Sequence, residues 1–265
     1  MSELVKAKKN LGQHFLNDKN IAFNIVDALL SKTVINDVLE VGPGMGVLTK
    51  YLLEAQPERA IWAAEIDTES IEYLHKNYPQ LGERLLAKSF LDLKFEDYYP
   101  NELVVIGNFP YNISSQIVFK IIDNKEKIPM MVGMFQKEVA ERLSAKPGGK
   151  EYGIISVITQ AYFDVDYLFT VHEDVFTPPP KVKSGVIRMT RKSGVPDCNQ
   201  NLFRTVVKTA FNQRRKKLRN AISSFGINDE QLGLFASKRA EELSLLDFVE
   251  LTNLVQEKGQ WKKDK

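Results

Sequence analysis

Short apolar runs alternate with helix-like stretches in the first half of the chain, and this alternation limits the possible folds most strongly. The apolar runs are residues 37–42 (DVLEVG), 60–67 (AIWAAEID), 84–90 (RLLAKSF), 103–108 (LVVIGN) and 129–136 (PMMVGMFQ). Strands that alternate with helices indicate an α/β fold with a doubly wound parallel sheet. Such sheets bind ligands beyond the carboxyl ends of their strands. The residues at those ends are Gly42, Glu65, Ser89 and Asn108.

The pattern changes near residue 193. Residues 146–153 (KPGGKEYG) are typical of a flexible loop, and 175–185 (VFTPPPKVKSG) of an extended one, because proline cannot donate to a ladder. Residues 193–201 (SGVPDCNQN) indicate a linker, and the pattern is helical from Leu202 onward. We therefore predict a first domain over residues 1–192 and a smaller helical domain over 193–265.

Composition excludes several classes of protein. With 265 residues, 43% of them hydrophobic, the chain can bury a sizeable core. We find no apolar signal region in residues 1–17 and no run near the roughly 18–20 residues that span a bilayer, so we expect no membrane association. Cys198 is the only cysteine, which fits a reducing cytoplasm. The histidines (His14, His75 and His172) have no metal-ligand spacing, so we expect no metal.

The glycine turn after the first strand has the spacing Gly42-x-Gly44-x-Gly46. Val47 stands where a dinucleotide fingerprint would have another glycine, and Pro43 removes an N–H that could cradle a phosphate. A glycine turn can also be merely a connection between a strand and a helix, with no ligand. If it binds a ligand, the missing N–H favours one without phosphates.

Glu65 ends the next strand, 23 residues after Gly42. A carboxylate at this place accepts hydrogen bonds from a ribose diol, although an acidic residue at a strand end can also be merely exposed. Together with the glycine turn, Glu65 indicates a nucleoside without phosphates. The ligand that fits this description is S-adenosylmethionine.

Residues 107–112 (GNFPYN) contain more than a turn requires. The exocyclic amine of adenine is a poor nucleophile, because its lone pair is delocalised into the ring. The Asn108 amide oxygen and the carbonyl of Phe109 or Pro110 could both accept from that amine and favour a pyramidal nitrogen. Tyr111 offers a flat face on which an extruded base could stack, worth about 1–3 kcal/mol.

Six motifs in order resemble those of the KsgA-type small-subunit rRNA adenine N6-dimethyltransferases: NLGQHFL, LEVGPGMG, EID, GNFPYNIS, FQKEVAER and VFTPPPKV. The resemblance runs from about residue 8 to FNQRRKKLRN, nearly the whole chain. It implies a Rossmann-like class I S-adenosylmethionine-dependent methyltransferase domain over residues 1–192. A helical rRNA-binding domain would occupy residues 193–265.

The resemblance also implies roles for individual residues. The catalytic residues would be Asn108, Pro110, Tyr111 and Phe176. The cofactor-binding residues would be His14, Leu16, Gly42, Gly44, Glu65, Ser89 and Asn108. Phe176 would stack on the adenine opposite Tyr111, although taken alone it is typical of a core residue. Ser89 departs from the family, which usually has Asp there to accept from the cofactor's adenine amine, and His14 stands where relatives often have Asn.

Positive charge is concentrated near the C-terminus. Residues 193–265 carry 13 basic and 9 acidic residues, a formal charge of +4, whereas residues 1–192 carry −2. Within residues 204–219 there are seven basic residues and no acid, and such a cluster favours phosphate binding. Its members are Arg204, Lys208, Arg214, Arg215, Lys216, Lys217 and Arg219. A single helix would place four of them on one face, whereas a break at Asn212 and Gln213 would not.

The resemblance implies that the partner is 16S rRNA in the assembling 30S subunit, bound by a monomer. Two adjacent adenosines in the hairpin loop near the 3′ end would each receive two methyl groups. One alternative is a related enzyme that methylates adenine in large-subunit rRNA or in DNA. Another is a ribosome-assembly or transcription factor that has kept the fold without catalysis, against which the intact Asn-Phe-Pro-Tyr motif argues.

Overall fold

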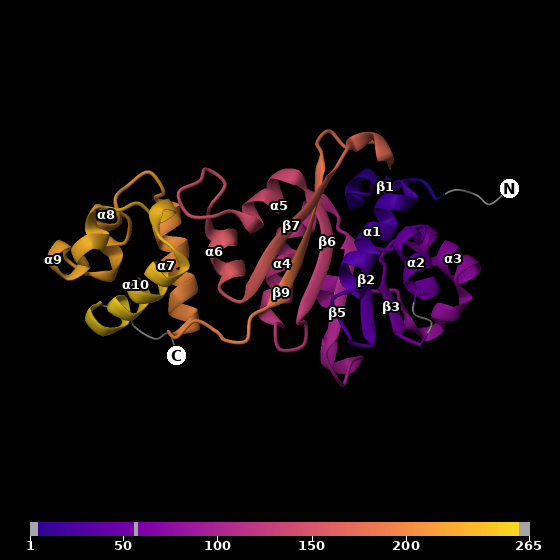
Figure 1. Cartoon of the computed structure of the whole chain (residues 1–265), viewed down its shortest axis with the longest axis horizontal. Coiled ribbons are helices and arrows are strands. Elements are labelled where there is room, and N and C mark those ends of the chain that lie inside the picture. The colour runs from indigo at the N-terminus through magenta and orange to yellow at the C-terminus, as the bar shows by residue number, and fades with distance from the viewer. Residues whose placement is uncertain (1–4, 56–57, 260–265) are drawn as a thin grey trace. The chain divides into compact units, whose positions relative to one another are not determined.

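The computed structural model of the chain describes residues 5–55 and 58–259 and divides into two compact units (Figure 1). The first unit comprises residues 1–140 and 164–191, and the second comprises 141–163 and 192–265. The second unit therefore differs from the predicted helical domain of residues 193–265, because it also includes residues 141–163. That stretch contains the loop 146–153 and a short helix, and both pack with the C-terminal helices.

The first unit is built on a seven-stranded sheet with the order β4-β3-β2-β5-β6-β9-β7, and β1 pairs separately with β8. Strands β2 to β6 run parallel to one another, and β9 is antiparallel to its neighbour β6. The strands are β1 Phe15–Leu16, β2 Asp37–Val41, β3 Ala60–Ala64, β4 Leu85–Leu86, β5 Leu103–Asn108, β6 Met130–Gln136, β7 Phe163–Val171, β8 Phe176–Thr177 and β9 Ser184–Arg191. The prediction of an α/β fold is confirmed, and the predicted parallel arrangement holds for β2 to β6, whereas β9 is antiparallel.

Helices follow the strands and cover the sheet. They are α1 Lys19–Leu30, α2 Val47–Ala55, α3 Thr68–Asn77, α4 Ser114–Asp123 and α5 Lys137–Ser144. The first five residues of β5 are all buried, so both faces of the sheet are covered there. Asp18 caps α1 and Asp67 caps α3 through side-chain bonds to backbone N–H groups. Asp67 becomes important for the site.

The second unit is helical around a small aromatic core. Its helices are α6 Ile154–Gln160, α7 Gln200–Asn212, α8 Leu218–Ala221, α9 Asp229–Leu232 and α10 Leu245–Lys258. Phe211 near the end of α7 stacks on Phe248 of α10, with ring centroids 5.8 Å apart. It also meets Tyr152 edge-on, with ring centroids 6.1 Å apart. Since α7 ends at Asn212, the single-helix interpretation of the basic cluster is wrong and the predicted alternative, a break, is correct.

Two exclusions made from the sequence concern membranes and metals, and a further finding concerns Cys198. Within the described ranges, no helix has the length and apolar character required to cross a membrane. The same residues contain no group of three or more His, Cys, Asp or Glu side chains that could hold a metal ion. Burial raises the pKa of the Cys198 thiol to about 11, so the thiol stays protonated at neutral pH.

Phe109 anchors the segment that follows β5. Its ring is buried, lies 4.9 Å from the Phe135 ring and covers two strand glycines, Gly107 and Gly133. A Cβ at Gly133 would lie 2.0 Å from the Phe109 ring, and one at Gly107 would lie 2.7 Å from a backbone carbonyl. The bulky apolar residue in Asn-Phe-Pro-Tyr therefore fixes the turn to the sheet.

We predict that Gly133→Ala destabilises the protein by about 1–3 kcal/mol, because the added methyl forces the Phe109 ring to move within a filled core. Urea unfolding measures the change. Gly194→Ala is the matched control, since a Cβ there meets nothing within 4 Å. Equal stability of the two variants would contradict the tight packing of Phe109 on Gly133.

Candidate functional site

The carboxyl ends of β2, β3, β4 and β5 meet at one edge of the sheet and line a single cavity. The N-terminal segment completes its wall. The lining residues are 11–16, 40–45, 47, 48, 64–66, 88–90, 108–111 and 113. All the residues predicted to bind cofactor are in this lining, as are Pro110 and Tyr111, whereas Phe176 is not.

The glycine turn has no free glycine N–H with which to hold an anion. Gly42, Gly44 and Gly46 all have positive φ, of 66°, 55° and 77°, which explains why glycine is needed. Each glycine N–H is bonded within the protein: Gly42 to the Ala64 carbonyl at 2.9 Å, Gly44 to Glu65 at 3.0 Å and Gly46 to the Pro43 carbonyl at 2.8 Å. Pro43 has no N–H. The turn therefore suits a ligand without phosphates, as its sequence indicates.

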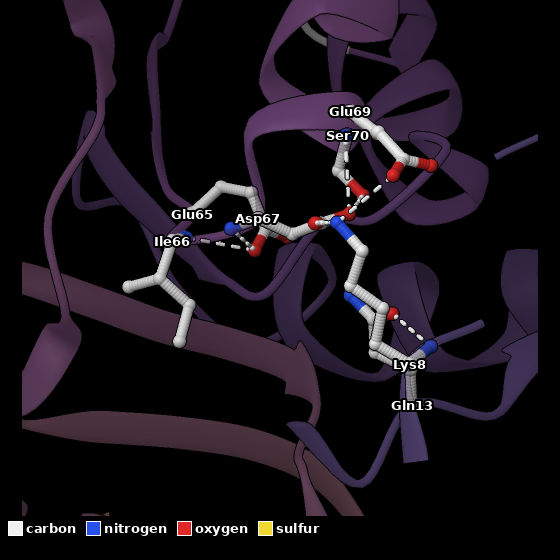
Figure 2. Close-up of polar contacts among 7 residues, drawn as sticks. All are labelled: Lys8, Gln13, Glu65, Ile66, Asp67, Glu69 and Ser70. Atoms are coloured by element: carbon white, nitrogen blue, oxygen red, sulfur yellow. Dashed lines mark hydrogen bonds and ion pairs between the residues drawn. The ribbon is translucent and has the colours of Figure 1, made fainter. Parts of the chain in front are cut away.

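The Glu65 carboxylate organises the same edge of the sheet (Figure 2). One oxygen accepts from the N–H of Gly44, and the other accepts from those of Ile66 at 2.8 Å and Asp67 at 2.9 Å. A carboxylate has about four lone-pair positions, so one remains for a ligand hydroxyl. Glu65 is buried at the cavity wall, where a diol could reach that position.

His14 joins the N-terminal segment to two other segments near the cavity. Its backbone carbonyl accepts from the Asn108 amide at 2.9 Å, and its Nδ1 lies 2.7 Å from the Pro178 carbonyl. The neighbouring Phe15 ring lies against the glycine turn, since a Cβ at Gly44 would be 2.8 Å from it. The backbone bond to Asn108 does not depend on the side chain at position 14, which explains why His is compatible there.

Asn108 is held with its amide oxygen available. The amide nitrogen donates to His14, and the oxygen has no hydrogen-bond partner among the described residues. The Pro110 carbonyl accepts from the Ser114 hydroxyl at 3.1 Å, whereas the Phe109 carbonyl accepts from no described residue. Of the two carbonyls that the sequence leaves open, that of Phe109 is the one with free capacity. An amine placed here would meet two acceptors.

Tyr111 is fixed on two sides. Its ring stacks on the His14 ring, with centroids 5.3 Å apart and planes 28° apart. Its hydroxyl lies 2.6 Å from that of the buried Ser184, at the start of β9. Burial raises the pKa of Tyr111, so the phenol stays neutral. One ring face is covered by His14, and the other is the face that a base could use.

Phe176 occupies the apolar core in this structure. Its side chain is 3% exposed and belongs to the same buried cluster as Leu16, with which it pairs across β1 and β8. The expectation that Phe176 stacks on a base opposite Tyr111 does not match this position. Stacking would require the ring to leave the cluster.

Ser89 lines the cavity but already has a local role. Its hydroxyl oxygen accepts from the Leu91 N–H at 3.2 Å and caps the short 3₁₀ helix Phe90–Asp92. Lys120 holds the same loop by donating to the carbonyls of Leu91 and Leu93, both at 2.7 Å. The loop is therefore tied to α4, and the Ser89 hydroxyl proton remains available to a ligand.

The sequence reasoning missed Glu40, a buried acid that lines the cavity two residues before Gly42. Burial raises the pKa of Glu40 to about 8, and Thr49 donates to its carboxylate at 2.5 Å. A charged residue inside the apolar run LEVG is the signal that could have identified it. A cation in the cavity would favour the ionised form of this group.

The basic cluster is divided among different environments in the second unit. Arg214 Nε donates to Glu241 at 2.5 Å and its Nη2 to the Gly149 carbonyl at 3.1 Å, so this guanidinium is used within the protein. Arg219 forms an ion pair with Asp229, with 3.3 Å between Nη1 and Oδ2. The other members of the turn after α7 are exposed: Arg215, Lys216 and Lys217. Lys208 is also exposed on α7, whereas Arg204 is half-buried there.

Comparison with known proteins gives the family. Residues 4–257 match the family model described as ribosomal RNA adenine dimethylase. A "Ribosomal RNA small subunit methyltransferase A" of Cytophaga hutchinsonii is 54% identical over 256 residues, covering 96% of this chain and 98% of that protein. The protein of the same name from Flavobacterium johnsoniae is 52% identical over 260 residues, covering 97% of this chain and 98% of that protein.

Solved structures agree on the fold. A dimethyladenosine transferase from Plasmodium falciparum superposes with a TM-score of 0.76 at 24% identity, covering 90% of this chain and 96% of that one. The 23S rRNA methyltransferase ErmE superposes with a TM-score of 0.68 at 20% identity, covering 92% of this chain and 100% of that one. At these identities the match concerns the fold alone, whereas the family match spans nearly the whole sequence. The chain belongs to the ribosomal RNA adenine dimethylase family.

Proposed function

We propose that this protein transfers methyl groups from S-adenosylmethionine to N6 of two adjacent adenosines in the hairpin loop near the 3′ end of 16S rRNA. The observation that carries the proposal is the pair of free acceptors, the Asn108 amide oxygen and the Phe109 carbonyl, at the wall of the cavity. Family membership and the names of the relatives that are about half identical support small-subunit rRNA as the substrate.

The cavity residues fit S-adenosylmethionine, which supplies a methyl group on a sulfonium. The remaining acceptor position of Glu65 suits the ribose diol, and the exposed Ile66 side chain offers an apolar surface to the adenine. Glu40 would face the cationic amino-acid part, and a cation there would favour its ionised form. The glycine turn provides close approach without an anion site.

Asn108 and Phe109 would orient the target amine. Two acceptors that bind its hydrogens disfavour delocalisation of the lone pair and leave that pair directed at the methyl group. Because an amide does not titrate, Asn108 acts as an orienting acceptor and not as a base. Tyr111, held by Ser184 and His14, would support the extruded base on the face that His14 does not cover.

The exposed basic residues of the second unit would bind rRNA phosphates. Arg215, Lys216 and Lys217 form the exposed part of the turn after α7, together with Lys208 on α7. We propose that this unit binds the assembling 30S subunit in the cytoplasm and that the protein acts as a monomer. Arg214 would instead maintain the shape of the turn.

The alternative substrate, large-subunit rRNA, has weaker support. The 23S rRNA methyltransferase shares the fold at 20% identity, whereas relatives above 50% identity carry the small-subunit name. The decisive experiment incubates the protein with labelled S-adenosylmethionine and either immature small subunits or large subunits, followed by mass spectrometry of nuclease fragments. We expect dimethyladenosine at two adjacent positions of 16S rRNA. Label in the large subunit alone would refute the proposal.

We predict that Asn108→Ala lowers single-turnover methyl transfer by at least about 100-fold, because the lost acceptor acts chiefly in the transition state. Subunit affinity should stay within a few-fold of wild type. Quench-flow kinetics and filter binding measure the two quantities. A near wild-type rate would show that Asn108 does not orient the amine.

We predict that Ser89→Asp tightens S-adenosylmethionine binding by about 1 kcal/mol, because a carboxylate accepts from the adenine amine more strongly than a hydroxyl. Asp also caps helices, so the local structure should persist. Repulsion from the nearby Asp92 opposes the gain. Calorimetric titration of the cofactor measures the change, and weaker binding by the variant would remove Ser89 from the adenine site.

We predict that changing Arg215, Lys216 and Lys217 together to Ala weakens subunit binding and reduces its dependence on salt, by about one unit of log–log slope per lost phosphate contact. A variant with Lys19, Lys32 and Lys76 changed to Ala loses the same charge from exposed sites of the first unit and serves as control. Filter binding over a salt series measures the affinity and its salt dependence for both variants. Identical slopes for the two variants would exclude the turn from the interface.

A further inference from the structure

The N-terminal segment (residues 8–16) forms a wall of the cavity but is not part of the main sheet. Residues 11–16 of this segment line the cavity. At its C-terminal end, Phe15 and Leu16 pair with β8. The other end needs a separate attachment if the wall is to stay in place over a ligand.

Lys8 supplies that attachment (Figure 2). Its ammonium forms a short hydrogen-bonded ion pair with Asp67 and lies 3.1 Å from Glu69 at the start of α3. Its backbone N–H donates to the Gln13 side chain at 2.8 Å, which folds the segment back on itself. Lys8 therefore fastens the segment to the loop that follows Glu65.

The ion pair differs from an ordinary surface pair, because Asp67 is buried. The Asp67 side chain is 1% exposed, and its second oxygen accepts from the N–H and hydroxyl of Ser70 as the cap of α3. Burial by itself opposes ionisation, but hydrogen bonds from Lys8 and Ser70 hold the pKa of Asp67 below its usual value. Without Lys8, a buried charge would lose its main counter-charge.

Asp67 is also linked directly to the ligand site. Its N–H donates to Glu65, whose other oxygen holds the Gly44 N–H. The chain of contacts thus runs from the glycine turn through Glu65 and Asp67 to Lys8 and the N-terminal segment. A ligand in the cavity would be enclosed by elements that these two carboxylates hold together.

We propose that Lys8 is a positioning residue for cofactor retention, because its ion pair with Asp67 and Glu69 keeps the N-terminal segment closed over the cavity. This inference rests on the proposed use of S-adenosylmethionine. Each methyl transfer requires spent cofactor to leave the cavity and fresh cofactor to enter it. The strength of the ion pair would therefore set how long donor and product remain bound.

Lys8→Met tests the proposal, with Lys9→Met as a control that removes the same charge from an exposed neighbour. Stopped-flow dissociation and calorimetry with S-adenosylmethionine and S-adenosylhomocysteine need no RNA. We expect Lys8→Met to raise both dissociation rates about tenfold and to raise KM for the cofactor, with single-turnover methylation at saturating cofactor within about twofold. Dissociation rates equal to those of Lys9→Met would overturn the inference.

Asp67→Asn separates the ion pair from general stability, because Asn keeps an acceptor for the α3 cap. Lys8→Met should change cofactor dissociation little in an Asp67→Asn background if the two residues act through one contact, and additive effects would refute that coupling. If the wild-type protein binds neither ligand, the proposed function itself fails. Ligand binding by wild type that Lys8→Met does not alter would reject the role of Lys8 alone.

Discussion

The cavity depends on one interaction, the acceptance of three backbone N–H groups by the Glu65 carboxylate. These bonds close the glycine turn on one side and shape the start of α3 on the other. Because the acceptor is charged, each is stronger than a bond between neutral groups. A parallel sheet brings strand ends together, but a buried carboxylate fixes how the loops beyond those ends meet.

Strand ends were the most predictable part of the molecule. Continuous apolar runs identify β2, β5 and β6, because a parallel strand covered on both faces tolerates few polar residues. Gly42, Glu65, Ser89 and Asn108 then lie together as a consequence of topology. By contrast, β7 is an edge strand with mostly partly exposed residues, so its sequence has no such run.

Where one residue type suits two environments, the sequence could not decide between them. Phe176 is apolar whether it stacks on a base or fills the core, and only its pairing with Leu16 places it in the core. Arg214 carries the same charge as Arg215, yet Glu241 and Gly149 bind its guanidinium. Similarly, no Gly or Pro marks the end of α7 at Asn212, so the sequence left both a single helix and a break open.

The saturated glycine turn has a thermodynamic consequence for how the two substrates are held. With its glycine N–H groups bonded internally, the cavity attracts a ligand mainly through apolar enclosure and a few directed polar contacts. Such association is marked by a negative heat-capacity change and little displacement of ions. In the proposed complex, RNA held through the exposed cations would instead release bound counterions to the solvent. Ionic strength would thus act far more directly on the proposed RNA binding than on the filling of the cavity.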